Sequence, residues 1–286
     1  MQFGKFSIEL LNTGIFALDG GAMFGVVPKI LWSKAYSRGD ESNRIPLSAQ
    51  PMLIRYDHKV ILVDTGNGTK LSDRLCEIYG IDKSKSDIVR ALAKFNVKAE
   101  DVTDVILTHL HFDHAGGGTT SDGKEIVPTF GNAKYYVQKS HFDWALNPSE
   151  KDRASFFRDN YMPLLNNSVL EFTENESEIF PGIRVLPVNG HTEGMQLVKL
   201  DSEGKTILYC ADLCATSAHV PIPYIMGYDN YPMKTLEEKK RIITRAHEEN
   251  WLMVYEHDAF VQASYIEKND RGYFAAEKVI ISEFGE

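Results

Sequence analysis

The sequence predicts an α/β fold, on three observations. Runs of β-forming residues alternate with segments of helical periodicity along the 286 residues. The composition is that of a globular protein, with 43% hydrophobic and 25% charged residues. Acidic and histidine side chains recur where β-rich runs end, at Asp64, His109, His191, Asp212 and His257. α/β proteins build their sites at strand ends, so we expect one site. A chain of 286 residues could form two average domains, but α/β folds often run this long as one, so we expect a single domain spanning residues 1–286.

The first half of the chain predicts strands followed by amphipathic helices. Strands are expected at 6–12, 104–109 and 133–138, and a hairpin at 51–66 that turns at Asp57 and His58. A helix is predicted over 86–97, where Ile88, Leu92 and Phe95 have helical spacing and Ser86 is the expected N-cap. Further helices are expected at 139–146 and near the start of 154–165, where Pro163 should disturb the end.

The second half repeats this alternation. Strands are predicted at 183–191, 195–200, 206–212 and 251–258. A helix is predicted over 235–250, starting at Thr235, and its charged run 237–241 is expected to form a solvated face.

Charge and cysteine content limit the classes of partner and compartment. The net charge of −9 argues against a nucleic-acid binder, which needs clustered Lys and Arg. Three cysteines do not form a disulfide framework and fit a reducing compartment. No apolar run has the length of a membrane helix or the form of a signal peptide, so we expect a cytoplasmic protein without membrane partners.

The stretch "HLHFDH" (109–114) concentrates metal-binding side chains. His109, His111, Asp113 and His114 offer four donors, and His191, Asp212 and His257 raise the number to seven. A catalytic zinc ion takes about three protein ligands, so seven donors favour two divalent ions that share a bridging carboxylate. Such a pair lowers the pKa of a bridging water to about 7, which predicts a hydrolase without a side-chain nucleophile. Zinc is the expected metal, and Mn, Fe and Co accept the same donors.

These residues resemble a known family. "HLHFDH" matches the H-x-H-x-D-H signature of the metallo-β-lactamase superfamily, and "LVDTG" (62–66) resembles its Asp-containing loop. The Gly-His pair at 190–191, the Ala-Asp pair at 211–212 and His257 follow in the superfamily's order. The resemblance implies a four-layer αββα sandwich of two mixed sheets with helices outside.

A more specific resemblance lies in "LDGGAMFGVVPKILWSK" (18–34) and "GYDNYPMKT" (227–235). Both stretches are similar to quorum-quenching lactonases of the YtnP type, relatives of methyl parathion hydrolase. This implies hydrolysis of N-acyl homoserine lactones, by attack of a metal-bridging hydroxide on the carbonyl, and a homodimer.

The resemblance also implies a role for each donor. His109, His111 and His191 would bind the first ion, Asp113, His114 and His257 the second, and Asp212 would bridge them. Asp64 would orient a ligand or brace its loop, and Asp113 would pass a proton to the leaving oxygen. Ala215 stands where other homoserine lactonases have a Tyr that assists the carbonyl, so any such aromatic must come from elsewhere, such as Tyr228 or Tyr231.

The substrate pocket is expected to involve Met23, Phe24, Trp32, His219 and Tyr228. Met23, Phe24 and Trp32 are equally compatible with a core or a dimer contact. His58, His141 and His247 are expected to be ordinary solvated residues, and Cys210 a buried apolar filler.

Several functions stay open at this point. The same two-metal site could serve a phosphotriesterase or a general esterase, because both reactions place charge on an oxygen held by a metal. A nuclease is disfavoured by the acidic charge. A module that binds a lactone without opening it is the non-enzymatic alternative, and turnover separates it from the rest.

Overall fold

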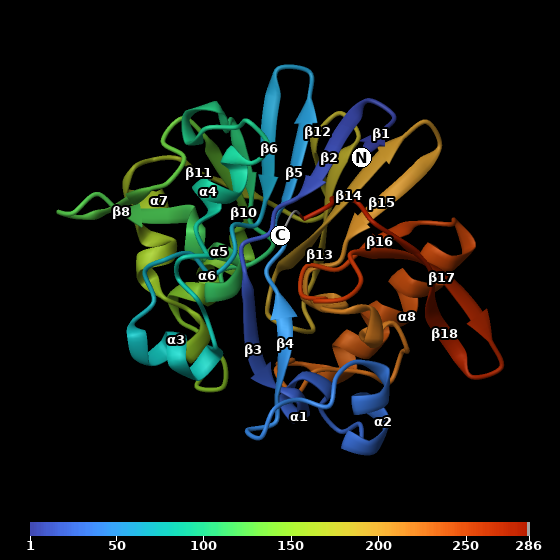
Figure 1. Ribbon diagram of the computed structural model, residues 1–286. Coiled ribbons are helices and arrows are strands. Elements are labelled where there is room, and N and C mark those ends of the chain that lie inside the picture. Colours follow the sequence, from blue (N-terminus) through green and yellow to red (C-terminus); the bar gives the residue numbers. More distant parts are fainter. Residues whose placement is uncertain (285–286) are drawn as a thin grey trace. The chain divides into compact units, whose positions relative to one another are not determined.

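The computed structural model describes residues 1–284 (Figure 1). Its chain contacts group into two compact units, each assembled from separate segments. Among the described residues, unit 1 comprises 1–14, 49–175 and 282–284, and unit 2 comprises 15–48 and 176–281.

Unit 1 contains a mixed seven-stranded sheet. Its strands, in sheet order, are β1 (Gln2–Phe3), β2 (Phe6–Leu10), β5 (Met52–Tyr56), β6 (Lys59–Val63), β7 (Asp104–Ile106), β10 (Lys134–Gln138) and β11 (Leu170–Thr173). Pairing is antiparallel from β1 to β6 and parallel from β6 to β11. The β5–β6 hairpin turns at Asp57 and His58 as expected, and Asp57 adopts a positive φ of 55°.

The helices of unit 1 are short and share a core with its sheet. They are α3 (Asp73–Tyr79), α4 (Ile88–Ala93), α5 (Phe112–Ala115), α6 (Lys139–Leu146) and α7 (Met162–Asn166), and a small β8–β9 pair joins Thr119–Ser121 to Ile126–Pro128. Leu92 of α4 and Phe142 of α6 belong to the same buried cluster as Leu62, Val105 and Tyr135 of the sheet. Burying side chains of this size stabilises the fold by roughly 1.5–3 kcal/mol each.

Two helix boundaries in unit 1 differ from the sequence expectation. The N-cap of α4 is Asp87, whose carboxylate accepts from the N–H groups of Val89 and Arg90. The helix expected near the start of 154–165 was wrong, because the chain forms 3₁₀ turns at Arg153–Ser155 and Arg158–Asn160 and Pro163 lies in the first turn of α7 instead of disturbing a helix end. A proline is tolerated there, since the first helical N–H groups have no partner within the helix.

Unit 2 contains a second seven-stranded mixed sheet. Its strands, in sheet order, are β12 (Ser177–Phe180), β13 (Ile183–Val188), β14 (Met195–Ser202), β15 (Lys205–Tyr209), β16 (Leu252–Val254), β17 (Ala263–Asn269) and β18 (Gly272–Val279). Only β15 and β16 pair in parallel, and the chain joins them through α8 (Pro232–Glu248). The buried face of α8 carries Ile242, Ile243 and Ala246, which share a core with residues of the sheet.

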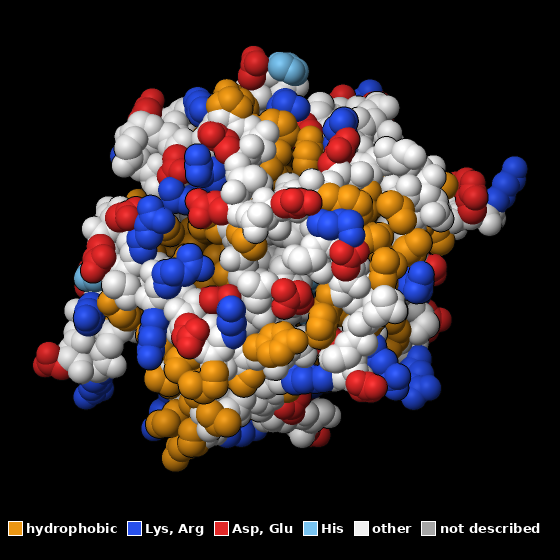
Figure 2. All heavy atoms as spheres, turned by 180° about the vertical axis from the view of Figure 1, so that it is seen from behind, with side chains coloured by type: hydrophobic (Ala, Val, Ile, Leu, Met, Phe, Trp, Pro, Cys, Tyr) orange, Lys and Arg blue, Asp and Glu red, His pale blue; other side chains and the backbone are white. Residues whose placement is uncertain are grey.

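A separate antiparallel pair, β3 (Ile15–Asp19) and β4 (Arg44–Ser48), also belongs to unit 2. The chain between these strands forms α1 (Gly20–Phe24) and α2 (Lys29–Ala35). Apolar side chains gather on the surface over α1 and α2, at the lower left of Figure 2. Val26, Ile30 and Leu31, which we call the α1–α2 patch, are 94%, 69% and 51% exposed.

The candidate donors follow strand ends with a regular offset. Asp64 directly follows β6, whereas His109, His191, Asp212 and His257 each lie three residues after the last residue of β7, β13, β15 and β16. Each unit therefore carries its donors on loops that a strand positions. Within residues 1–284, no helix is both long and apolar enough to cross a membrane.

Candidate metal centre

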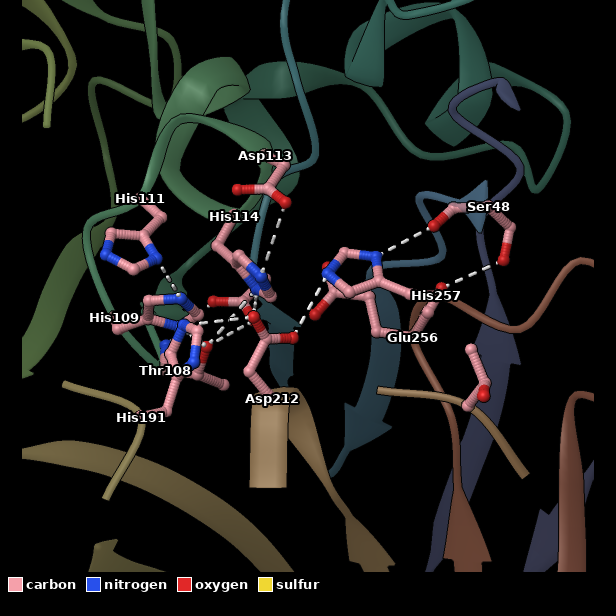
Figure 3. A network of polar contacts seen from close by, with 12 residues as sticks. Ser48, Thr108, His109, His111, Asp113, His114, His191, Asp212, Glu256 and His257 are labelled. Carbon is pink, nitrogen blue, oxygen red and sulfur yellow. Dashed lines mark hydrogen bonds and ion pairs between the residues drawn. The ribbon is translucent and has the colours of Figure 1, made fainter. Parts of the chain in front are cut away.

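Unit 1 gathers four donors on the loop after β7 and on α5. His109 and His114 are fully buried, and His111 and Asp113 are 7% and 8% exposed. His109 Nε2 lies 3.1 Å from His111 Nδ1, and His114 Nε2 lies 3.9 Å from an oxygen of Asp113 (Figure 3). The ring nitrogens of one histidine thus face the donor atoms of another residue, which is the arrangement that a shared cation stabilises.

Asp64 and Thr108 determine which ring nitrogens carry protons. Thr108 donates its hydroxyl proton to Asp64 Oδ2 at 2.6 Å, so its oxygen accepts from His109 Nδ1 at 3.1 Å. Asp64 Oδ2 also accepts from His114 Nδ1 at 3.1 Å. In the neutral ring, a proton on Nδ1 leaves the lone pair on Nε2, so His109 and His114 both present Nε2 as a metal donor.

The backbone of Asp64 is itself unusual, with a φ of +58°. Its carboxylate accepts from the N–H of Thr108 at 2.7 Å, and its own N–H donates to Ile106 O at 2.9 Å. These bonds tie the end of β6 to the end of β7 and offset a conformation that costs of order 1 kcal/mol or more for a non-glycine residue.

His141 was expected to be solvated, and that expectation was wrong. Its side chain is fully buried, and its Nε2 accepts from the N–H of Leu110 at 2.8 Å. Leu110 lies between the donors His109 and His111, so His141 holds their backbone. The sequence signal for this burial was the position of His141 in α6, where it shares the buried face of the helix with Phe142 and Ala145.

Unit 2 gathers two imidazoles around one carboxylate. Asp212 Oδ2 lies 3.1 Å from His191 Nε2, and Asp212 Oδ1 lies 3.3 Å from His257 Nε2 (Figure 3). Asp212 is 7% exposed, and both imidazoles are more deeply buried. One carboxylate therefore directs a different oxygen toward each of two imidazoles, as a bridging ligand would.

The far sides of these two imidazoles also fix their tautomers. His257 Nδ1 donates to the carbonyl oxygen of Ser48 at 2.9 Å, and His191 Nδ1 bonds an oxygen of Asp229 at 3.0 Å. A carbonyl or carboxylate oxygen accepts, so the proton sits on Nδ1 and the Nε2 of each neutral ring faces an Asp212 oxygen with its lone pair. The Nε2 of each ring thus faces an Asp212 oxygen at about 3 Å, an arrangement suited to a divalent ion, because imidazole and carboxylate are ligands of Zn²⁺ and similar ions.

The loop that carries Asp212 is strained. Ala211 has a φ of +41°, in the region that L-residues rarely adopt. Such strain tends to collect at functional sites. Sequence reasoning found Asp212 but missed Asp229, which lies 38 residues from His191 in the chain and meets it through folding alone.

The five residues expected around the substrate pocket all lie in unit 2. Met23, Phe24, Trp32 and His219 are at most 2% exposed, whereas Tyr228 is 36% exposed. Phe24 stacks on His219 and on Trp32 with ring centroids 4.6 and 5.3 Å apart. His219 Nε2 donates to Met23 O at 2.8 Å, and its Nδ1 accepts from Thr216 at 2.7 Å. Burial lowers the pKa of His219 to about 4, so the ring is neutral.

Comparison with known proteins places these features in a family. A family model described as the metallo-beta-lactamase superfamily matches residues 44–255. An N-acyl homoserine lactonase from Bacillus thuringiensis is 26% identical over 221 residues, covering 72% of this chain and 79% of that protein.

Solved structures match over nearly the whole chain. A "probable metal-dependent hydrolase" from Staphylococcus aureus is 32% identical with a TM-score of 0.87, covering 98% of this chain and 100% of that one. AidC, a dizinc quorum-quenching lactonase in complex with a product, is 18% identical with a TM-score of 0.82, covering 98% and 97%.

The expected fold class is confirmed, because two large mixed sheets with helices match the fold of these structures. The His and Asp clusters are suited to binding metal ions, as the expected cofactor class requires. The chain belongs to the metallo-β-lactamase superfamily, as a metal-dependent hydrolase.

Proposed function

We propose that this protein opens the lactone ring of N-acyl homoserine lactones, and so acts in quorum quenching, with two divalent ions as cofactors. The observation that carries the proposal is the geometry of Asp212, whose two oxygens face the Nε2 lone pairs of two different histidines. Relatives named N-acyl homoserine lactonase support the choice of substrate.

The proposal assigns a role to each of the seven donors. His109, His111 and His191 would hold one ion, Asp113, His114 and His257 would hold the other, and Asp212 would be shared between them. Asp64 and Asp229 orient His114 and His191 by holding the Nδ1 proton of each ring. Zinc is the ion we propose, and Mn, Fe and Co accept the same donors.

The chemistry then divides between the ions and the chain. When bound, two such ions supply a water nucleophile of lowered pKa and a Lewis acid for the carbonyl oxygen. The buried imidazoles and carboxylates exclude bulk water around that position. Asp113, at 8% exposure, transfers the proton to the leaving alkoxide oxygen of the ring.

The substrate is a small molecule, and we propose that Tyr228 contacts it. Tyr228 is the most exposed of the five pocket residues, whereas Met23 is buried and Phe24, Trp32 and His219 form a buried stack. Tyr231, at 44% exposure, is the second aromatic that could assist the carbonyl.

We propose a homodimer formed through the α1–α2 patch. Val26, Ile30 and Leu31 are exposed apolar side chains, and burying them in an interface stabilises the dimer by about 25 cal/mol per Å² of apolar surface removed from water. We also propose a cytoplasmic location, which fits three cysteines that are all free thiols.

The test is a pH-stat titration of the purified, metal-replete protein with short- and long-chain N-acyl homoserine lactones, with a chelator-treated control. Acid release that the chelator abolishes supports the proposal. Acid release from phosphotriesters or simple esters, but not from lactones, supports the alternative hydrolase activity and contradicts the lactonase proposal. Lactone binding without acid release, in protein shown to carry two ions, indicates a binding module and contradicts the proposal.

A further inference from the structure

Two charged residues of α8 face inward, against the expectation of a solvated face at 237–241. Glu238 is 6% exposed and Lys239 is fully buried, whereas Glu237 and Lys240 are exposed. Burying a charged side chain costs several kcal/mol unless hydrogen bonds compensate it. Each of the two must therefore bind something specific.

Glu238 binds the backbone in front of His191. Its Oε1 accepts from the N–H of Asn189 at 2.8 Å, and its Oε2 accepts from the N–H of Gly190 at 3.0 Å. The turn formed by Asn189 and Gly190 packs directly against α8. A Cβ added to Gly190 would stand 2.3 Å from Thr235 Oγ1 and 2.4 Å from Thr235 N, so there is no room for a side chain. The main chain that carries His191 is thus fixed on the helix.

Lys239 binds the loop that leads to Asp229. Its Nζ donates to Pro221 O at 3.0 Å and to Tyr224 O at 2.7 Å. Five residues further on, Asp229 accepts from His191 Nδ1 at 3.0 Å, and the next N–H, of Asn230, donates to His191 O at 3.0 Å. The partner of the imidazole is therefore held by the same helix as the backbone of His191.

We propose that Glu238 and Lys239 are positioning residues for His191. Glu238 sets the place of its Cα through two main-chain bonds, and Lys239 sets the direction of its ring through the loop that bears Asp229. The two side chains are neighbours on one helix, so α8 defines both the position and the angle of the Nε2 lone pair. This inference rests on the proposed function, in which His191 is a metal ligand.

The chemistry of each side chain suits this role. A carboxylate has two acceptor oxygens for two N–H groups, and a glutamine would present an N–H₂ group to one of them. An ammonium group donates to two carbonyl oxygens at once, and an arginine retains that capacity whereas a methionine has none.

The experiment uses Glu238→Gln and Lys239→Met, with the exposed neighbours Glu237→Gln and Lys240→Met as matched controls. Metal affinity is measured by competition with a chromophoric chelator, and ligand geometry by the visible absorption of the cobalt-substituted protein. Losing a residue that orients a metal ligand typically weakens metal affinity 10–100-fold. We expect a weakening of that size and an altered cobalt band in Glu238→Gln and Lys239→Met, no change in the controls, and recovery of most of the affinity in Lys239→Arg.

Wild-type metal affinity and an unchanged cobalt spectrum in both inward variants would overturn the inference. If circular dichroism shows that Glu238→Gln does not fold, the comparison of Lys239→Met with Lys239→Arg tests the inference. Loss of metal affinity in Lys239→Met that Lys239→Arg does not recover also contradicts the inference. His191→Ala separates this inference from the proposed function. If His191→Ala binds both ions as tightly as the wild type, the ligand role of His191 fails, whatever α8 does.

Discussion

Four of the five histidines at the candidate metal centre have a neighbouring oxygen that fixes the tautomer of the ring. Ser48 O, Asp229, Asp64 and Thr108 each bond a different Nδ1, and the metal donor of the ring is then its Nε2. These neighbours come from distant parts of the chain. Sequence reasoning could name the imidazoles but could name only Asp64 among the groups that orient them.

Asp113→Ala is expected to lower both metal content and hydrolysis. The substitution removes a carboxylate that lies 3.9 Å from His114 Nε2 and that we propose as both ligand and proton donor. Metal content by elemental analysis and turnover by pH-stat measure the two effects. Wild-type turnover in a verified Asp113→Ala protein would remove this residue from the mechanism.

His219 makes the stability of the metal-free protein depend on pH. Burial lowers its pKa from about 6.5 to about 4, so the unfolded chain binds a proton at higher pH than the folded one. The contribution of the neutral His219 ring to the free energy of unfolding is complete above pH 6.5 and is lost as the pH falls toward 4. By pH 5 the free energy of unfolding has fallen by about 2 kcal/mol.

The measurement for His219 is urea unfolding at pH 7.5 and pH 5, with a chelator present so that metal release does not contribute. His219→Gln cannot titrate in this range and keeps an amide that donates to Met23 O. The loss of stability between the two pH values should be smaller in His219→Gln by about 2 kcal/mol. An equal loss in both proteins would mean that His219 does not titrate as its burial implies.

Among the elements, the helices with a strongly periodic pattern were predictable. α6 has the expected bounds, whereas α8 starts at Pro232 rather than Thr235 because proline suits the first helical turn. α1 and α2 were not predicted, since the apolar run around them has no polar face. The signal for α1 was Asp19, whose carboxylate caps its first turn by accepting from Ala22 N.

The inward residues of α8 show a second limit of sequence reasoning. The run 237–241 is charged throughout, and periodicity alone does not distinguish a buried Glu or Lys from an exposed one. Burial of Glu238 and Lys239 depends on the loops that supply their partners. Those loops are positioned by tertiary structure.

The glycine turn after α5 gives a prediction at the scale of the element. A Cβ on Gly116 would lie 2.0 Å from Asn67 O, whereas no atom lies within 4 Å of a Cβ on Gly131. Gly116→Ala should therefore destabilise the protein by about 1–3 kcal/mol, and Gly131→Ala by less than about 0.5 kcal/mol. Urea unfolding measures both, and equal stabilities would contradict the close approach of the two loops.

At the scale of the whole molecule, neither unit is continuous in sequence. The chain leaves unit 1 after Gly14, returns at Ala49, leaves again after Asn175 and returns at Ser282. We propose that the two units form one folding domain, as the length suggested. Calorimetry of the metal-free protein should then show one cooperative transition, with equal calorimetric and van't Hoff enthalpies. Two resolved transitions would contradict a single domain.

The proposed homodimer gives a second prediction at this scale. Ile30→Asp places a charge in the α1–α2 patch and should convert the dimer into a monomer in sedimentation equilibrium. Ile280→Asp is the matched control, because Ile280 is 74% exposed and Ile30 is 69% exposed, and it should leave the dimer intact. A monomeric wild-type protein, or dissociation in both variants alike, would reject this patch as the interface.

The hydroxyl of Ser282 accepts from the N–H of Leu10 at 2.7 Å, across 272 residues of chain. Because translation proceeds from the N-terminus, β2 leaves the ribosome long before this partner does. The buried N–H of Leu10 gains this acceptor only when the chain has been synthesised through Ser282. A nascent chain stalled before Ser282 lacks this acceptor, so we expect protection of the Leu10 amide from hydrogen exchange to arise only after Ser282 has left the ribosome.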